Sequence, residues 1–154
     1  MVTVGSKAPG FKLASKPGHV VDVAAKLGQE KVVLLFIPLA FSPVCSTELC
    51  TFRDDWSKWS SLGCTVYAIS VDSPFVTDKF RTELGIPFEV LSDFNKDVSR
   101  TYGALFEDLM GLKGVGKRAA FVIDAGGKVV YAQVNAEAGQ QVDFAAIEQA
   151  VRSC

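Results

Sequence analysis

Apolar residues gather in short runs along the chain, and these runs predict the strands of a sheet. The longest, Lys31-Val-Val-Leu-Leu-Phe-Ile37, is continuous, which is typical of a central strand covered on both faces. The other predicted strands are 10–13, 19–23, 64–71, 87–91, 118–124 and 128–134. The first two of these and the last two flank short turns that contain glycine, so we expect a hairpin near each end of the chain.

Helical periodicity separates the strands. A long helix is predicted over Pro43 to Ser61, with Ser42 as a favourable N-cap. At about 100° per residue, its apolar side chains share one face, namely Cys45, Leu49, Phe52, Trp56 and Trp59. Further helices are predicted at 73–84, 96–102 and 143–152, and the glycine-containing segment 110–116 is expected to be a flexible connection. This alternation indicates an α/β fold with a central mixed β-sheet flanked by helices.

The composition excludes several classes of protein. The length of 154 residues predicts a single domain over 1–154. With 49% hydrophobic residues and a net charge of −1, the chain resembles neither a disordered protein nor a nucleic-acid-binding one. No apolar run approaches the roughly 20 residues of a membrane helix, and the N-terminus lacks the pattern of a secretory signal. We therefore expect a cytoplasmic protein that binds neither nucleic acid nor membranes.

The residues with the most specific chemistry are four cysteines and one histidine. In a reducing compartment cysteines are more often catalytic or buried than bridged. A zinc site is not expected, because Cys45 and Cys50 are followed by no second pair of ligands at the usual spacing. His19 follows Pro17-Gly18 in a predicted turn, so we interpret it as a structural or exposed residue rather than a catalytic base.

Cys45 has the sequence context of a reactive thiol. It lies in the first turn of the predicted helix, directly after a buried strand, where free backbone N–H groups and the helix dipole favour a thiolate. A lowered pKa is expected for such a cysteine. Ser42 places a hydroxyl one turn earlier. The alternative interpretation is structural, with Ser42 only capping the helix and Cys45 only packing.

The segment around Cys45 resembles the active-site motif of the peroxiredoxins, which is a proline, three residues, a threonine or serine, two residues and a cysteine. The matching residues are Pro38, Ser42 and Cys45. A distant segment, Lys117-Arg118-Ala-Ala-Phe-Val-Ile-Asp124, resembles the strand-borne arginine of the same family. Further similarity lies at 8–11, 66–72, 91–93 and 102–103, so that it covers essentially the whole chain. The resemblance implies a thioredoxin-like fold with an N-terminal β-hairpin.

The resemblance also implies a role for each matching residue. Cys45 would be the peroxidatic cysteine, and Arg118 would supply fixed N–H donors to its sulfur and to the peroxide oxygens. Ser42 and the Cys45 backbone N–H would bind the substrate. Pro38 would shield the thiolate from water, and Glu48 would hold the arginine. Most of the family has threonine where this chain has Ser42, so the hydroxyl lacks the methyl group that restricts χ1.

The sequence leaves open which thiol resolves the oxidised Cys45. Cys50, five residues after Cys45, resembles the resolving residue of the peroxiredoxin Q subgroup, and we favour it. Its distance across an intact helix, roughly 8.6 Å between Cα atoms, requires local unwinding before a disulfide can form. Cys154, at the last position, is the competing candidate. The one-cysteine alkyl-hydroperoxide-reductase E type, reduced by an external thiol, is also similar, and Cys64 is expected to be inert.

The function implied is a thiol-dependent peroxidase that reduces hydrogen peroxide and organic hydroperoxides through a cysteine sulfenic acid. No metal, haem or flavin is expected, and the reductant would be thioredoxin or a similar dithiol protein, such as a glutaredoxin-like one. The family allows a monomer or a homodimer. The alternative is a peroxide-sensing redox switch that is oxidised once and signals to a partner. A general disulfide oxidoreductase is disfavoured because the chain has no Cys-x-x-Cys motif.

Overall fold

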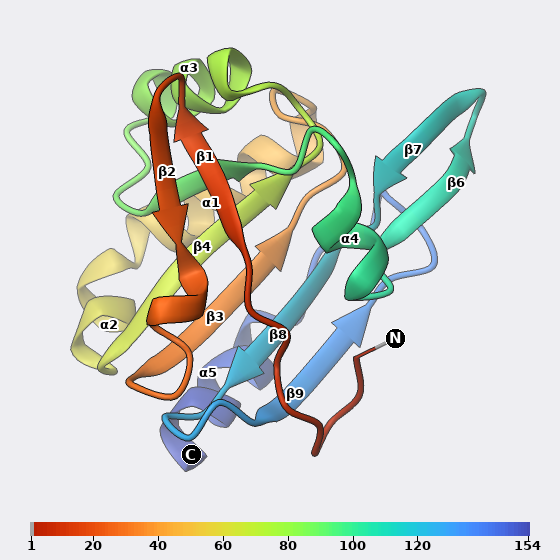
Figure 1. Ribbon diagram of the computed structural model, residues 1–154. Coiled ribbons are helices and arrows are strands. Elements are labelled where there is room, and N and C mark those ends of the chain that lie inside the picture. The colour runs from red at the N-terminus through yellow and green to blue at the C-terminus, as the bar shows by residue number, and fades with distance from the viewer. Residues whose placement is uncertain (1) are drawn as a thin grey trace.

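A seven-stranded sheet forms the centre of the computed structural model, which describes residues 2–154 (Figure 1). Its strands are β1 (Lys12–Lys16), β2 (His19–Asp22), β3 (Lys31–Phe36), β4 (Cys64–Ser70), β5 (Glu89–Ser92), β8 (Ala119–Ile123) and β9 (Val129–Val134). They lie in the order β2-β1-β5-β4-β3-β8-β9. Strands β3, β4 and β5 are parallel, and the remaining pairs are antiparallel, so the predicted mixed sheet and both predicted hairpins are confirmed.

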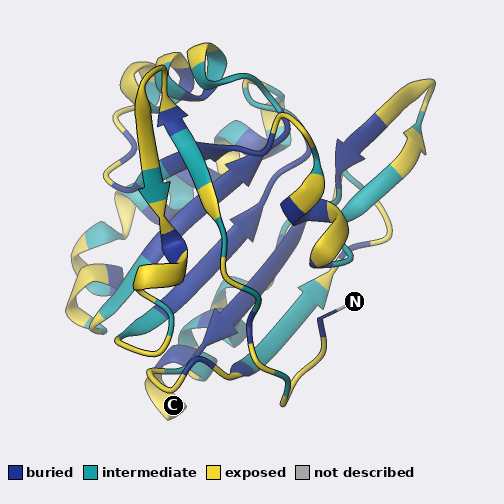
Figure 2. Cartoon of the chain, in the orientation of Figure 1, coloured by how far each residue is buried: buried dark blue, intermediate teal, exposed yellow. Residues whose placement is uncertain are grey.

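The central strands are buried because both faces of the sheet are covered. Val33 and Leu35 of β3 belong to one apolar cluster, whereas Leu34 and Phe36 belong to the other, as the alternation of side chains along a strand requires. Figure 2 shows the resulting dark band of buried residues through β3, β4 and β8. A continuous apolar run is therefore what this position in the sheet demands.

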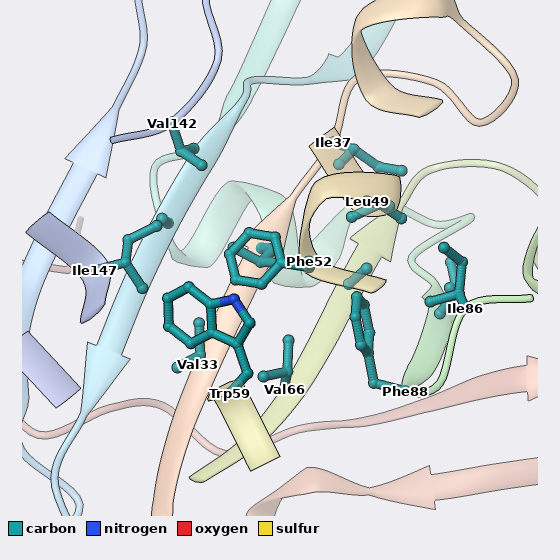
Figure 3. Close-up of a cluster of buried hydrophobic side chains, with 14 of the residues drawn as sticks. Val33, Ile37, Leu49, Phe52, Trp59, Val66, Ile86, Phe88, Val142 and Ile147 are labelled. Carbon is teal, nitrogen blue, oxygen red and sulfur yellow. The ribbon is translucent and has the colours of Figure 1, made fainter. Parts of the chain in front are cut away.

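Helices cover the sheet on both sides. They are α1 (Pro43–Asp54), α2 (Trp56–Ser61), α3 (Pro74–Leu84), α4 (Asp97–Thr101) and α5 (Phe144–Ser153), with a short 3₁₀ helix at Val23–Ala25. Residues of α1, α2 and α5 pack into one cluster, which includes Phe52 and Trp59 (Figure 3). The centroids of these two rings are 4.7 Å apart. Within residues 2–154, no helix is both long enough and apolar enough to cross a membrane.

The long helix predicted over residues 43–61 is wrong in one respect, because it is broken at Asp55. This residue has φ −99° and ψ 19°, outside the helical range, and it separates α1 from α2. Two adjacent aspartates, Asp54 and Asp55, are unfavourable near a helix C-terminus because their charge opposes the helix dipole. Aspartate also has a low helix propensity. The apolar periodicity continues across the break, which is why the pattern alone predicts one helix.

The flexible connection predicted at residues 110–116 is also wrong, because the segment belongs to a two-stranded ribbon. Strand β6 (Leu105–Leu109) pairs with β7 (Leu112–Gly116). Met110 and Gly111, at the turn, have φ of 52° and 86°, as a two-residue hairpin of the mirror-image type requires. The glycines here therefore permit a tight turn and do not indicate flexibility.

The antiparallel pairing of β3 with β8 brings two distant parts of the chain together. Phe36, at the end of β3, is opposite Ala119, at the start of β8. The loop that follows β3 therefore lies beside Arg118, which precedes β8. Close approach is needed here, since a side-chain carbon on Gly116 would lie only 3.0 Å from the Ile37 carbonyl oxygen.

Candidate active site

Cys45 lies in the first turn of α1 and is completely buried. It occupies the third helical position, where the backbone N–H has no acceptor within the helix. Ser42 stands at the N-cap position, but its hydroxyl makes no capping hydrogen bond. Instead, Ser42 Oγ donates to the Leu39 carbonyl at 2.9 Å. The prediction that Ser42 caps the helix is therefore correct for its position and wrong for its side chain, which is already bonded to its own loop.

Arg118 is the charged group that contacts the thiol. Its Nη2 donates to Cys45 Sγ at 3.2 Å, and the arginine side chain is 1% exposed. A guanidinium stays charged at any physiological pH, so this site provides a permanent cation and several N–H donors beside the sulfur. Its Nε donates to the Ala138 carbonyl at 3.1 Å, which fixes the orientation of the planar group.

Glu48 lies one turn after Cys45 and pairs with the same arginine. Its Oε1 is 3.5 Å from Arg118 Nη1 and also accepts from the Val142 backbone N–H at 3.4 Å, while Oε2 is buried without a hydrogen-bond partner. Burial raises the pKa of the Glu48 carboxyl to about 7, although the Arg118 charge acts in the opposite direction. Near neutral pH the Glu48 carboxyl is therefore close to the midpoint between its neutral and charged forms.

The loop between β3 and α1 is anchored by a hydrogen bond to Asp72, which follows the neighbouring strand β4. The Asp72 carboxylate accepts from the Ala40 backbone N–H at 2.7 Å. Phe41 adopts a left-handed backbone, with φ 67°, and its ring packs edge-on against the buried Phe80. Pro38 is buried two residues after the end of β3. The loop that carries Ser42 is thus a defined structure with one strained residue.

Comparison with known proteins identifies the family. Residues 4–132 match the model of the AhpC/TSA family. A Mycobacterium tuberculosis protein assigned to the peroxiredoxins is 37% identical over 139 residues, which cover 89% of this chain and 88% of the relative. The chain belongs to the peroxiredoxins. Alkyl hydroperoxide reductase E of Mycobacterium tuberculosis is 33% identical over 136 residues, covering 87% of this peroxiredoxin and 86% of that protein.

A solved structure supports the same conclusion for the fold. The crystal structure of peroxidoxin BcpB from Mycobacterium tuberculosis superposes with a TM-score of 0.86 at 26% identity, covering 99% of this peroxiredoxin and 98% of that chain. The predicted thioredoxin-like fold with its N-terminal hairpin is confirmed. The protein is a thiol-dependent peroxidase, as the predicted family membership implies.

The other cysteines of this peroxiredoxin are in three different environments. Cys50 is half-buried on α1, and Cys64 is half-buried at the start of β4, where burial raises the pKa of its thiol to about 11. Cys154 is exposed. The end of α5 lies beside the start of β3, since Lys31 Nζ donates to the Val151 carbonyl at 2.9 Å. Cys154 is therefore at the opposite end of β3 from Cys45, and six residues of strand span roughly 20 Å.

Sequence reasoning missed the groups that hold Arg118 and Glu48 in place. The Ala138 carbonyl and the Val142 N–H are backbone atoms, which no side-chain motif reveals. Asp72 is a second omission, and its position directly after a predicted central strand was the available signal, because the carboxyl ends of parallel strands meet at one edge. His19 lies exposed at the start of β2, in agreement with the prediction.

Proposed function

We propose that Cys45 is the peroxidatic residue of this peroxidase and that Arg118 stabilises the charge that develops during attack on the peroxide. The hydrogen bond of 3.2 Å from Arg118 Nη2 to Cys45 Sγ is the observation that carries this proposal. In a buried site, a permanent cation with fixed donors stabilises charge more strongly than it would in water. Glu48, paired with Arg118, would limit its movement.

The reaction at this site is a nucleophilic displacement. The Cys45 thiolate attacks one peroxide oxygen, forms an S–O bond and breaks the O–O bond, so that sulfur is oxidised and the peroxide is reduced. The leaving alkoxide or hydroxide takes a proton and departs as an alcohol or water, and Cys45 remains as the sulfenic acid. The Cys45 N–H, which Ser42 does not cap, is available to bind a peroxide oxygen.

Access to the thiol requires a local movement. Cys45 is 0% exposed, so a peroxide cannot reach it through the structure as it stands. The neighbouring loop is the element placed to move, because Phe41 is 46% exposed and Ser42 is only half-buried. We propose that outward movement of Ser42 frees its hydroxyl from the Leu39 carbonyl and allows it to orient the substrate, while Pro38 continues to exclude water.

Cys50 is the proposed resolving residue. Its thiol displaces the sulfenic oxygen of Cys45 as water and forms a disulfide, which a thioredoxin-type dithiol protein then reduces. Cys50 is on the same helix and half-buried, whereas Cys154 lies at the other end of the sheet. The five-residue separation is roughly 8.6 Å between Cα atoms in an intact helix, above the 7 Å limit for a disulfide. Formation of the disulfide therefore requires α1 to unwind.

The proposed substrates are hydrogen peroxide and organic hydroperoxides. The similarity to alkyl hydroperoxide reductase E supports the organic class. The protein is proposed to act as a monomer or a homodimer, and thioredoxin or a glutaredoxin-like protein is the proposed electron donor.

Coupled turnover tests this proposal. With thioredoxin, thioredoxin reductase and NADPH, wild-type protein is expected to consume many equivalents of peroxide, and Cys45→Ser is expected to consume none. Cys64→Ser is the matched control and should retain wild-type turnover. Consumption of a single equivalent by the wild type would instead indicate a redox switch, and retained activity in Cys45→Ser would exclude Cys45 as the peroxidatic residue.

A further inference from the structure

The segment that follows β9 contacts both members of the Arg118–Glu48 ion pair. Residues 136–142 contain no helix or strand, yet they supply the Ala138 carbonyl to Arg118 Nε and the Val142 N–H to Glu48 Oε1. Both groups are backbone atoms of a loop whose residues are mostly exposed. Val142 packs into the apolar cluster and so holds the end of the loop, but the exposed residues before it need hydrogen bonds to fix their position.

Asn135 satisfies that requirement. Its side chain is at the base of the loop, and the residue is only 6% exposed. Asn135 Nδ2 donates to the Gln140 carbonyl at 2.7 Å and to the Gln141 carbonyl at 3.2 Å, so one amide group joins the residue before the loop to two residues near its end. The Asn135 backbone N–H donates to the Arg118 carbonyl at 2.9 Å, which ties the same residue to the arginine.

The orientation of the Asn135 amide is fixed in turn by Gln133. Gln133 Nε2 donates to Asn135 Oδ1 at 2.8 Å, so the oxygen of the amide is occupied and its nitrogen faces the loop. Gln133 Oε1 accepts from the Asp143 N–H at 2.9 Å, directly after the loop ends. The pair of amides therefore fastens both ends of the loop to β9.

We propose that Asn135 is a positioning residue for peroxide reduction, which acts through the loop to fix the guanidinium plane of Arg118 and the carboxylate of Glu48. This inference rests on the proposed role of Arg118. Hydrogen-bond donors aimed at a transition state lose their effect when they are displaced by about 1 Å, which typically costs up to about 100-fold in rate. Glu48 gives the loop additional importance, since Val142 and Arg118 are the only partners of its carboxylate among the described residues.

The test compares two rate constants for the same thiol. Asn135→Asp keeps the size of the side chain and the acceptor for Gln133, but it replaces the donors to Gln140 and Gln141 with an oxygen. We expect the rate constant for oxidation of Cys45 by hydrogen peroxide to fall about 10–100-fold, relative to the rate constant for alkylation of Cys45 by iodoacetamide. A purely structural role would reduce the amount of folded protein and leave this ratio unchanged in the folded fraction. Asn135→Ala is the second variant if the aspartate prevents folding.

Two controls make the outcome specific. Val129→Ala removes a buried side chain of the opposite apolar cluster and should lower stability without changing the ratio. In an Arg118→Met background, Asn135→Asp should have no further effect, since a residue that acts through Arg118 loses its effect when Arg118 is absent.

An unchanged ratio in both Asn135 variants, or a full additional loss in the Arg118→Met background, would overturn this inference. The proposed function would survive either result, because it is tested separately by the turnover of the wild type and of Cys45→Ser and by the rate of Arg118→Met.

Discussion

Arg118 donates from Nη2 to Cys45 Sγ across 3.2 Å although 73 residues separate the two in the chain. The contact depends on the antiparallel pairing of β3 with β8, which places the start of one strand beside the end of the other. It also depends on Glu48 and the Ala138 carbonyl, which restrain the guanidinium from two sides. The proposed chemistry is therefore a property of the sheet topology as much as of the helix that carries the cysteine.

Replacing Arg118 by methionine should affect the reaction more than the fold. Loss of one fixed donor to a developing charge typically costs about 10²–10³ in rate, and we expect a loss of this size in the first oxidation of Cys45, measured by stopped-flow tryptophan fluorescence. Arg118→Lys retains the charge without the planar fork and should recover only part of the rate. A loss below about tenfold in a folded Arg118→Met protein would contradict the proposed role.

The same substitution should be tolerated best at acid pH. Breaking a buried ion pair usually costs about 3–5 kcal/mol, because the remaining charge is left uncompensated. Burial already raises the pKa of Glu48 to about 7, so below this pH the carboxyl can remain neutral when Arg118 is absent. Urea denaturation of Arg118→Met at pH 5.5 and 8 should therefore show the larger destabilisation at pH 8.

Glu48 should make the protein less stable as the pH rises from about 4.5 to about 7. The unfolded carboxyl loses its proton near 4.5, whereas the folded carboxyl keeps it to about 7, so the folded state binds more protons in this interval and unfolding becomes easier. Each unit of pKa difference corresponds to about 1.4 kcal/mol. Glu48→Gln should lack this decrease, as measured by urea denaturation across the interval.

The half-exposed Glu148 provides the matched control for this measurement. Hydrogen bonds from Arg152 and Lys58 lower the pKa of its carboxyl, which is the opposite direction. Glu148→Gln should therefore leave the decrease between pH 4.5 and 7 in place. If Glu48→Gln shows the same pH profile as the wild type, the buried carboxyl does not hold its proton as proposed.

Replacing Cys50 by serine should separate the two halves of the catalytic cycle. The first oxidation of Cys45 should remain fast, whereas recycling by thioredoxin should stall, because no thiol is available on α1 to form the disulfide. In the wild type, peroxide treatment should produce a Cys45–Cys50 cross-link in peptide mapping and faster amide hydrogen exchange over residues 45–51. Cys154→Ser should recycle normally, and a Cys45–Cys154 cross-link would refute the assignment.

Cys64 should be the slowest of the accessible thiols to react. Burial raises the pKa of its thiol to about 11, so little thiolate is present near neutral pH, whereas Cys154 is exposed. In a Cys45→Ser, Cys50→Ser background, iodoacetamide at pH 7.5 should label Cys154 first. The rate of Cys64 labelling, measured by mass spectrometry, should rise about tenfold per pH unit between pH 7 and 9. Equal labelling of both residues in the folded protein would contradict this expectation.

The sequence predicts the parts of the fold in which one physical signal dominates. Apolar runs such as 31–37 reveal the central strands because burial on both faces leaves few alternatives. The break at Asp55 escapes prediction because apolar periodicity and helix propensity conflict there, and the periodicity extends through the break. The ribbon of β6 and β7 escapes because glycine permits both a flexible loop and a tight turn.

The candidate site shows the same division. Cys45, Arg118 and Glu48 are predicted to meet because their motifs resemble those of the peroxiredoxins, and the structure brings all three together. The direction of the Ser42 hydroxyl could not be predicted, since it depends on the local path of the loop. The Ala138 carbonyl has no sequence signature at all, because every residue has the same backbone acceptor.

The position of β8 late in the chain has a consequence during protein synthesis. When the ribosome has made α1, the nascent polypeptide has its cysteine but lacks the arginine, which is translated 73 residues later. At roughly 5–20 residues per second, this interval lasts about 4–15 s. Throughout it, β3 has no β8 partner, and the thiol has no cation beside it. We therefore expect peroxide reactivity to emerge only as translation nears completion, so that an unfinished chain is protected from premature oxidation by the order in which its parts are made.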